Sequence, residues 1–247
     1  MIKIKNKFII ISPPRAGSTT LMRILNSQKA FTIFEPFNEI NLGLKKKNYF
    51  TLLRNNKIKL SVKELMRTCD GIKHIYDHSE DVYENNISLN QYLFNKYNVI
   101  LLYRKNLLES ALSYVLAKKT DLWQKTDLWQ KKEINEKSLE NIYKNIGNID
   151  LSEIISFIKK NQNILACESK IKNCYKISYE DLYSENWRFY IKEIFNFIDF
   201  PIIDWNFIES LINKDKNKLN NMSLFNMVKN IKEIKALGCN EFGYIGD

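Results

Sequence analysis

Short apolar runs alternate with amphipathic stretches along this chain. Four runs rich in β-branched residues are typical of parallel strands buried on both faces, and a fifth, shorter run is a further candidate. These runs cover Phe8–Ser12, Ile72–Tyr76, Asn98–Tyr103, Cys174–Ser178 and, as the fifth, Phe31–Phe34. Helical spacing of apolar residues occurs at 61–66, 88–97, 107–118 and 187–198. The alternation predicts an α/β fold, a doubly wound, mainly parallel sheet with flanking helices, with ligands at the carboxyl ends of the strands.

The length of the chain and the lack of a long linker indicate a single domain over residues 1–247. Two segments interrupt the pattern, and we expect them to be variable insert or lid segments. Residues 38–60 are polar and lysine-rich, and residues 120–131 repeat the sequence Thr-Asp-Leu-Trp-Gln-Lys in tandem. Trp123 and Trp129 in this repeat are suited to stacking on a sugar ring, and equally to ordinary packing. The first candidate helix has Ser61 and Glu64 at the spacing of a capping box, which predicts that it begins at Ser61.

Composition narrows the class of protein further. The 247 residues are 45% hydrophobic and carry a formal net charge of +10, but the lysines are spread along the chain. This charge is compatible with a polyanionic ligand and gives no indication of a nucleic-acid partner.

The four cysteines are scattered, so we expect free thiols and no metal site. No apolar run reaches the roughly 18–20 residues needed to cross a bilayer. We therefore expect a cytoplasmic protein with no integral membrane segment, and the oligomeric state stays open, a homo-oligomer included.

The loop after the first predicted strand carries the strongest chemical signal. It contains Pro13 and Pro14, followed by Arg15, Ala16, Gly17, Ser18, Thr19 and Thr20, and a helical pattern starts there. Helix N-termini present free N–H groups and a partial positive charge, and a glycine lets an anion approach the backbone closely. Arginine and hydroxyl side chains add donors for phosphate or sulfate oxygens. Because the loop has one glycine and no lysine before Ser18, ATP or GTP hydrolysis is disfavoured.

A second candidate anion site follows the strand Asn98–Tyr103. Arg104 lies at its end and Ser113 lies further along the next helical pattern. An arginine in such a place more often pairs with a carboxylate, so taken alone this signal is weak. Together with the first loop, it indicates a ligand that is phosphorylated at two places.

These motifs resemble those of the sulfotransferases that use 3′-phosphoadenosine 5′-phosphosulfate (PAPS). Residues 14–20 look like the 5′-phosphosulfate loop of that family, and residues 103–113 look like its 3′-phosphate motif. Residues 177–182 resemble its Tyr-Glu-Asp-Leu segment, and Phe242-Gly243-Tyr244 resembles its Leu-Gly-Tyr ending. The order of the motifs from residue 8 to about 244 is also similar. Residues 113–123 look closest to the bacterial carbohydrate sulfotransferases of the trehalose type.

The resemblance implies a P-loop-like fold and transfer of a sulfuryl group from PAPS, without a metal, leaving adenosine 3′,5′-bisphosphate (PAP). It implies a hydroxyl or amine acceptor, preferably a carbohydrate or glycolipid; a peptide tyrosine or a small metabolite remains open. The implied cofactor-binding residues are Arg15, Ala16, Gly17, Ser18, Thr19, Thr20, Arg104, Ser113 and Tyr179, and Arg15 would also act in catalysis. Tyr179 is nearly as well explained as a core aromatic residue.

The chain also departs from the family pattern. Ser113 follows Arg104 by nine residues where eight is usual, and counting from Lys105 restores the spacing, so either cation is a candidate for the 3′-phosphate. Thr20 replaces the common aromatic residue, and the Arg-Lys-Gly loop that cytosolic members carry near their C-terminus is missing.

Glu35 is the candidate catalytic base. It lies between Phe34 and the pair Pro36 and Phe37, so partial desolvation would raise its pKa, and related carbohydrate sulfotransferases carry a similar segment. An ordinary surface glutamate explains the residue equally well. His74 and His78 are the alternative bases.

Other charged residues near the motifs have simpler explanations. Lys73 offers a further cation, although a solvated lysine is the simpler interpretation. Glu180 and Asp181 are expected to cap the helix that follows them.

Two other functions remain open from the sequence. One is a P-loop nucleotide kinase-like phosphotransferase with a degenerate loop, against which the missing lysine argues. The other is a catalytically inactive protein that binds adenosine bisphosphate.

Overall fold

The computed structural model describes residues 6–37, 57–76, 86–120, 146–219 and 228–242. The chain divides into two compact units, residues 1–105 with 164–215, and residues 106–163 with 216–247. The single domain expected over residues 1–247 is not tested by this division and stays a prediction. Within the described residues, no helix is both long and apolar enough to span a membrane.

The first unit is built on a five-stranded sheet with the order β2-β3-β1-β4-β5, in which every pairing is parallel. Its strands are β1 (Phe8–Ser12), β2 (Thr32–Phe34), β3 (Gly71–Ile75), β4 (Asn98–Tyr103) and β5 (Cys174–Ser178). The predicted α/β fold with a parallel sheet is therefore confirmed, and the fifth candidate run forms an edge strand. Because all strands run the same way, the loops that follow them leave the sheet at one edge.

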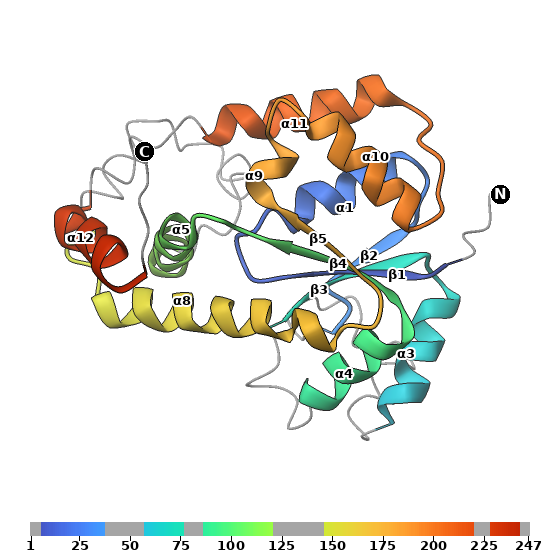
Figure 1. Cartoon of the computed structure of the whole chain (residues 1–247), viewed down its shortest axis with the longest axis horizontal. Helices are drawn as coiled ribbons and strands as arrows, with labels where there is room; N and C mark the ends of the chain where they lie inside the picture. Colours follow the sequence, from blue (N-terminus) through green and yellow to red (C-terminus); the bar gives the residue numbers. More distant parts are fainter. Residues whose placement is uncertain (1–5, 38–56, 77–85, 121–145, 220–227, 243–247) are drawn as a thin grey trace. The chain divides into compact units, whose positions relative to one another are not determined.

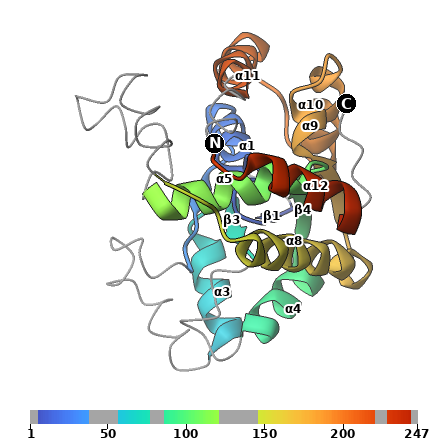
Figure 2. The same cartoon turned by 90° about the vertical axis from the view of Figure 1, so that its left-hand side faces the viewer.

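Helices cover both faces of this sheet (Figures 1 and 2). One face carries α1 (Ser18–Ser27), α9 (Tyr179–Leu182), α10 (Trp187–Phe197) and α11 (Trp205–Leu219) as far as Asp215, and the other carries α3 (Ile58–Arg67) and α4 (Asn86–Lys96). Side chains such as Ile9, Ile72 and Leu101 form a buried core with α3 and α4. The predicted start of α3 at Ser61 is wrong. The helix begins three residues earlier, after Lys57, and Ser61 is fully buried inside it.

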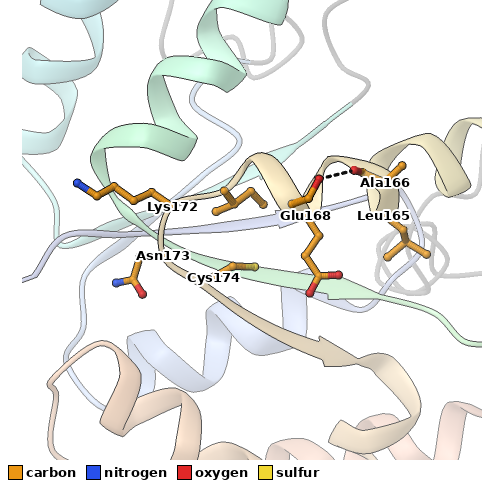
Figure 3. Close-up of a pocket in the computed structure, with 8 residues that line it drawn as sticks. Leu165, Ala166, Glu168, Lys172, Asn173 and Cys174 are labelled. Atoms are coloured by element: carbon orange, nitrogen blue, oxygen red, sulfur yellow. Dashed lines mark hydrogen bonds between the residues drawn. The ribbon is translucent and has the colours of Figure 1, made fainter.

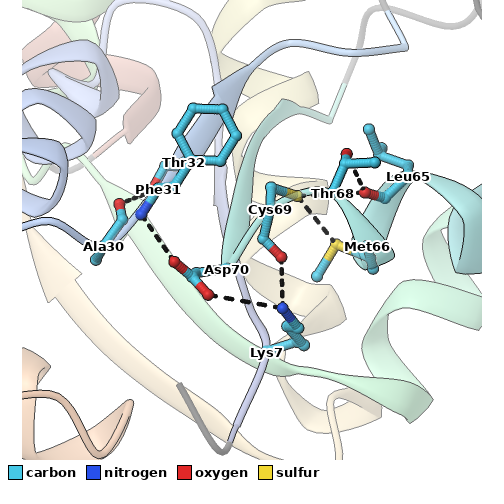
Figure 4. Close-up of polar contacts among 9 residues, drawn as sticks. All are labelled: Lys7, Ala30, Phe31, Thr32, Leu65, Met66, Thr68, Cys69 and Asp70. Carbon is cyan, nitrogen blue, oxygen red and sulfur yellow. Dashed lines mark hydrogen bonds and ion pairs between the residues drawn. The ribbon is translucent and has the colours of Figure 1, made fainter. Parts of the chain in front are cut away.

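The starts of three strands are tied together at the amino edge of the sheet (Figure 4). Lys7 Nζ donates a 2.6 Å hydrogen bond to the Cys69 carbonyl and lies 3.6 Å from the Asp70 carboxylate. The same carboxylate accepts a 3.0 Å bond from the Phe31 N–H. These contacts join the segments that enter β1, β2 and β3, and so help to fix the strand register at the edge opposite the predicted site.

The second unit has its own core. It contains α5 (Leu107–Thr120), α12 (Ile231–Phe242) and most of α8 (Leu151–Ala166), which belongs to this unit as far as Asn163. The last residues of α8 belong to the first unit, where the short 3₁₀-helix Cys167–Lys170 precedes β5. Asn106 caps α5, since its side-chain oxygen accepts a 2.9 Å bond from the Glu109 N–H. Tyr114 stacks on Phe157 with ring centres 4.6 Å apart. This packing places Ser113 on a helix that belongs to the second unit.

Candidate functional site

The loop between β1 and α1 has the backbone of an anion-binding turn. Gly17 is the N-cap residue of α1 with φ of 81°, and Arg15 has φ of 64°, which is rare for a residue with a side chain. Gly17 has no side chain with which to cap the helix, and the first turn of α1 contains no acidic residue. The start of α1 therefore keeps its positive dipole end and backbone N–H groups available for an anion.

Tyr179, the first residue after β5, packs its ring directly on this loop. A Cβ atom placed on Gly17 would lie 2.5 Å from Cδ2 of the Tyr179 ring, so only glycine fits there. The Arg104 guanidinium also lies on the Tyr179 ring, with its central carbon 4.2 Å from the ring centre. Tyr103 and Ser178 are paired in the β4–β5 register, which explains why the next residues along each strand meet. Gly17, Tyr179 and Arg104 thus form one contiguous row.

The acidic residues that follow Tyr179 separate the roles of the two candidate cations. Arg104 is buried, and its Nε lies 3.7 Å from Glu180. Lys105 is about half exposed, and its Nζ donates a 2.7 Å hydrogen bond to Asp181. That bond raises the pKa of Lys105 above its ordinary value. Arg104 therefore lies in the row with Tyr179 and Gly17, while Lys105 is held at the surface.

Asp181 also forms the predicted helix cap. Its N–H donates a 3.0 Å bond to Ser178 Oγ, and its carboxylate accepts a bond from the Ser178 N–H, which completes a capping box at the start of α9. Burial alone would raise the pKa of Asp181, but the bonds from Lys105 and Ser178 outweigh it and lower the pKa. The expectation for Asp181 is confirmed. Glu180 has a different role, since its carboxylate accepts a 2.9 Å bond from the Lys105 N–H.

Glu35 and Lys73 form a buried ion pair beside the same edge of the sheet. The two side chains are 10% and 3% exposed, so neither the surface glutamate nor the solvated lysine describes them. Glu35 has φ of 39°, a strained value that places its carboxyl group next to β3. Burial lowers the pKa of Lys73 below its ordinary value, and the charge of Glu35 opposes this shift. The pair brings a carboxylate to the loops that follow β1 and β2.

His74 is placed differently from Lys73. Successive residues of a strand point to opposite faces, so His74 shares the α3 and α4 face with Ile72. Its Nε2 lies 2.9 Å from Asn90 Oδ1 on α4, and its ring packs edge-on against Phe37. The structure therefore separates His74 from the face that carries Lys73 and Glu35. His78 lies outside the described residues.

One buried hydroxyl lies at the end of β1, just before the loop that leads to α1. Ser12 ends β1 and is fully buried, and within the described part of the chain its Oγ has no hydrogen-bond partner. The β1–β3 register pairs Ser12 with Ile75, so its side chain is on the same face as Lys73. The hydroxyl is enclosed by the protein, so it is a buried polar group of the sheet and does not point to a ligand.

Several other predictions stay untested. Ser113 belongs to the second unit, so its pairing with Arg104 remains a prediction. The repeat after Thr120, most of the segment 38–60 and the residues Gly243 and Tyr244 lie outside the described residues.

A surface hollow of about 670 Å³ lies elsewhere, at the amino end of β5 (Figure 3). It is lined by Leu165, Ala166, Glu168, Ser169, Ile171, Lys172, Asn173 and Cys174. Burial raises the pKa of the Cys174 thiol to about 11, which leaves it a poor nucleophile. No cluster of three or more metal-binding side chains occurs among the described residues. The hollow therefore lies at the opposite end of β5 from the candidate site.

Two functional candidates were not apparent from the sequence. The pairing of Lys73 with Glu35 joins residues far apart in the chain, and only the alternation along β3 hinted that Lys73 shares a face with Ile75 and not with His74. The contact of Glu180 with Arg104 likewise depends on the β4–β5 pairing.

The chain is weakly similar to some solved structures. No protein-family model and no curated protein matches the chain. A crystal structure of mouse sulfotransferase SULT7A1 complexed with PAP is similar at 12% identity and a TM-score of 0.43, over 86% of this chain and 63% of that one. The sulfotransferase domain of the Synechococcus PCC 7002 olefin synthase is similar at 15% identity and a TM-score of 0.37, over 80% and 74% of the two chains. The chain thus spans less than two thirds of SULT7A1, and at these TM-scores the two structures carry no argument for function.

Proposed function

We propose that this protein is a sulfotransferase, which moves a sulfuryl group from PAPS to a hydroxyl or amine acceptor. The observation that carries the proposal is the row of Gly17, Tyr179 and Arg104. It joins a helix N-terminus suited to one anion with a buried guanidinium suited to a second, and both lie against the same aromatic ring. An adenosine phosphorylated on both sides of its ribose matches this order of groups.

The residues present fit PAPS. We propose that Arg15 and the backbone N–H groups from Gly17 to Thr19 bind its 5′-phosphosulfate. Arg104 binds the 3′-phosphate, and Tyr179 packs on the adenosine. Bound PAPS supplies a sulfuryl group on a phosphate leaving group, and its spread negative charge is stabilised by fixed donors without a metal.

Glu35 is the base that we propose for the acceptor. As a buried carboxylate at the end of β2, it is placed among the loops that leave this edge of the sheet. It accepts the proton that the acceptor hydroxyl or amine must lose, a contribution of roughly 10²–10⁴ in rate. The acceptor that we propose is a carbohydrate or glycolipid, on the resemblance of residues 113–123 alone.

Calorimetric titration tests the nucleotide part of the proposal. PAP should bind more tightly than AMP, because AMP lacks the 3′-phosphate, and more tightly than ATP with Mg²⁺. Arg15→Ala should abolish PAP binding, whereas Lys176→Met, which breaks an exposed ion pair on β5, should leave it intact. Tighter binding or turnover of ATP with Mg²⁺ would instead indicate a kinase.

Transfer of ³⁵S from labelled PAPS tests the reaction. Carbohydrates, glycolipids, peptides and small metabolites form the acceptor panel, and a labelled carbohydrate or glycolipid product is expected. Tight PAP binding without transfer to any member of the panel would indicate an inactive binding protein.

A further inference from the structure

We propose that Lys73 is a positioning residue that keeps the Glu35 carboxylate ionised and oriented on the α1 face of the sheet. This role is distinct from nucleotide binding. Its importance for catalysis rests on the proposed function. The physical claim about the pair itself can be tested without a nucleotide or an acceptor.

Both the backbone and the side chain of Lys73 hold Glu35. The Glu35 N–H donates a 2.9 Å hydrogen bond to the Lys73 carbonyl, and the Lys73 ammonium contacts the Glu35 carboxylate. The ammonium also lies 4.1 Å from the centre of the Phe34 ring, its register partner on β2. Two contacts from Lys73 therefore hold Glu35, whose own φ of 39° is strained, and a third holds the neighbouring Phe34.

Burial makes the charge of a neighbouring cation such as Lys73 important for the charge state of Glu35. A carboxylate that is 10% exposed loses most of its hydration, and without a cation it would favour the protonated form, which cannot act as a base. A neighbouring ammonium reverses this preference because it stabilises the anion directly. Lys73 therefore keeps a desolvated carboxylate able to accept a proton.

Other titratable groups lie on the described segments next to the pair. The loop after β1 contributes Arg15, and β3 with its next residue contributes His74 and Tyr76. His74 faces the opposite side of the sheet. The helix α1 packs on β2 and β3, and its single titratable residue, Arg23, is exposed. Lys73 is thus the buried cation that the structure pairs with Glu35.

The experiment follows the Glu35 carboxyl directly by ¹³C NMR on protein labelled at the glutamate side-chain carboxyl carbon, with Glu35→Gln used for assignment. Lys73→Met should raise the titration midpoint of Glu35 by about one pH unit or more, because the opposite charge is lost. Lys73→Arg should restore a midpoint near that of the original protein, since it returns the charge. Lys176→Met removes a lysine from an ion pair whose side chains are over a third exposed, and should leave the Glu35 midpoint unchanged.

Calorimetry with PAP separates this role from nucleotide binding. Lys73→Met should bind PAP as the original protein does. An unchanged Glu35 midpoint in Lys73→Met would overturn the proposal, and loss of PAP affinity with an unchanged midpoint would assign Lys73 to the nucleotide. If Lys73→Met does not fold, Lys73→Gln replaces it with the same expected rise in midpoint. Absence of PAP binding in the original protein would contradict the proposed function, while the NMR titration would still decide the role of Lys73.

Discussion

The Arg104 guanidinium lies 4.2 Å from the centre of the Tyr179 ring, and the same ring covers Gly17 in the loop after β1. Residues that follow three different strands, β1, β4 and β5, therefore lie against one another at the Tyr179 ring. The proposed site for two anions depends on these contacts at the Tyr179 ring more than on any one side chain.

Gly17→Ala should damage the site more than its backbone strain alone explains. A left-handed φ costs a residue with a Cβ roughly 1–2 kcal/mol, and at Gly17 the new Cβ would also meet the Tyr179 ring at 2.5 Å. We expect a lower melting temperature and loss of PAP binding by calorimetry.

Gly147→Ala is the matched control for this change. Gly147 has φ of 75°, but nothing lies within 4 Å of the position of its Cβ. It should therefore show the strain without the clash and retain PAP binding. Equal loss of stability in the two variants would contradict the tight packing of Tyr179 on Gly17.

Arg104→Ala and Lys105→Ala should differ in their effect on nucleotide binding. Arg104 is buried in the row, so its loss should weaken PAP binding roughly 10–100-fold and leave AMP binding little changed. Lys105 is engaged with Asp181 at the surface, and exposed pairs of this kind contribute about 0.2–1 kcal/mol to stability. Its removal should therefore leave the preference for PAP over AMP intact. The opposite pattern in calorimetry would assign the 3′-phosphate to Lys105.

The sheet was largely predictable from the sequence because its strands are continuous apolar runs between polar segments. β1, β4 and β5 have the predicted bounds, and β3 is shifted by one residue because Gly71 already pairs with Phe8. The start of α3 was mispredicted because a capping-box spacing also occurs inside helices. Ser61 fits that spacing, but its N–H already donates to the Lys57 carbonyl.

The site was predictable only where single segments determine it. The loop from Arg15 to Thr20 carries its own glycine and helix start, so its backbone could be inferred locally. Whether Arg104 or Lys105 turns inward depends on Glu180 and Asp181, which lie more than 70 residues away in the chain. The partner of Glu35 is likewise 38 residues away, and no local pattern records such a contact.

Cys174 should make the protein less stable in alkali. Burial raises the pKa of its thiol from 9.0 to about 11, so the folded protein keeps a proton that the unfolded chain loses. The contribution of the protonated thiol to the free energy of unfolding is complete below pH 9, and it is lost as the pH rises to about 11. Melting temperatures measured between pH 8 and 10 should fall more steeply for the original protein than for Cys174→Ala. Tyr97 and Tyr175, whose pKa values are raised to about 12, act mainly above this range. Parallel curves for the two proteins would show that the thiol is not protected.

Glu35→Gln should separate binding from chemistry. The amide keeps the shape of the side chain and can still accept a hydrogen bond from Lys73, but it cannot take a proton. Once an acceptor has been found by ³⁵S transfer, turnover should fall roughly 100-fold or more, while PAP affinity by calorimetry stays unchanged.

Glu64→Gln, which alters an exposed pair with Arg67 on α3, is the control and should retain full turnover. His74→Gln should also remain active, because His74 bonds Asn90 on the opposite face of β3. Near-normal turnover in Glu35→Gln would remove Glu35 from the reaction and return the role of base to His74 or His78.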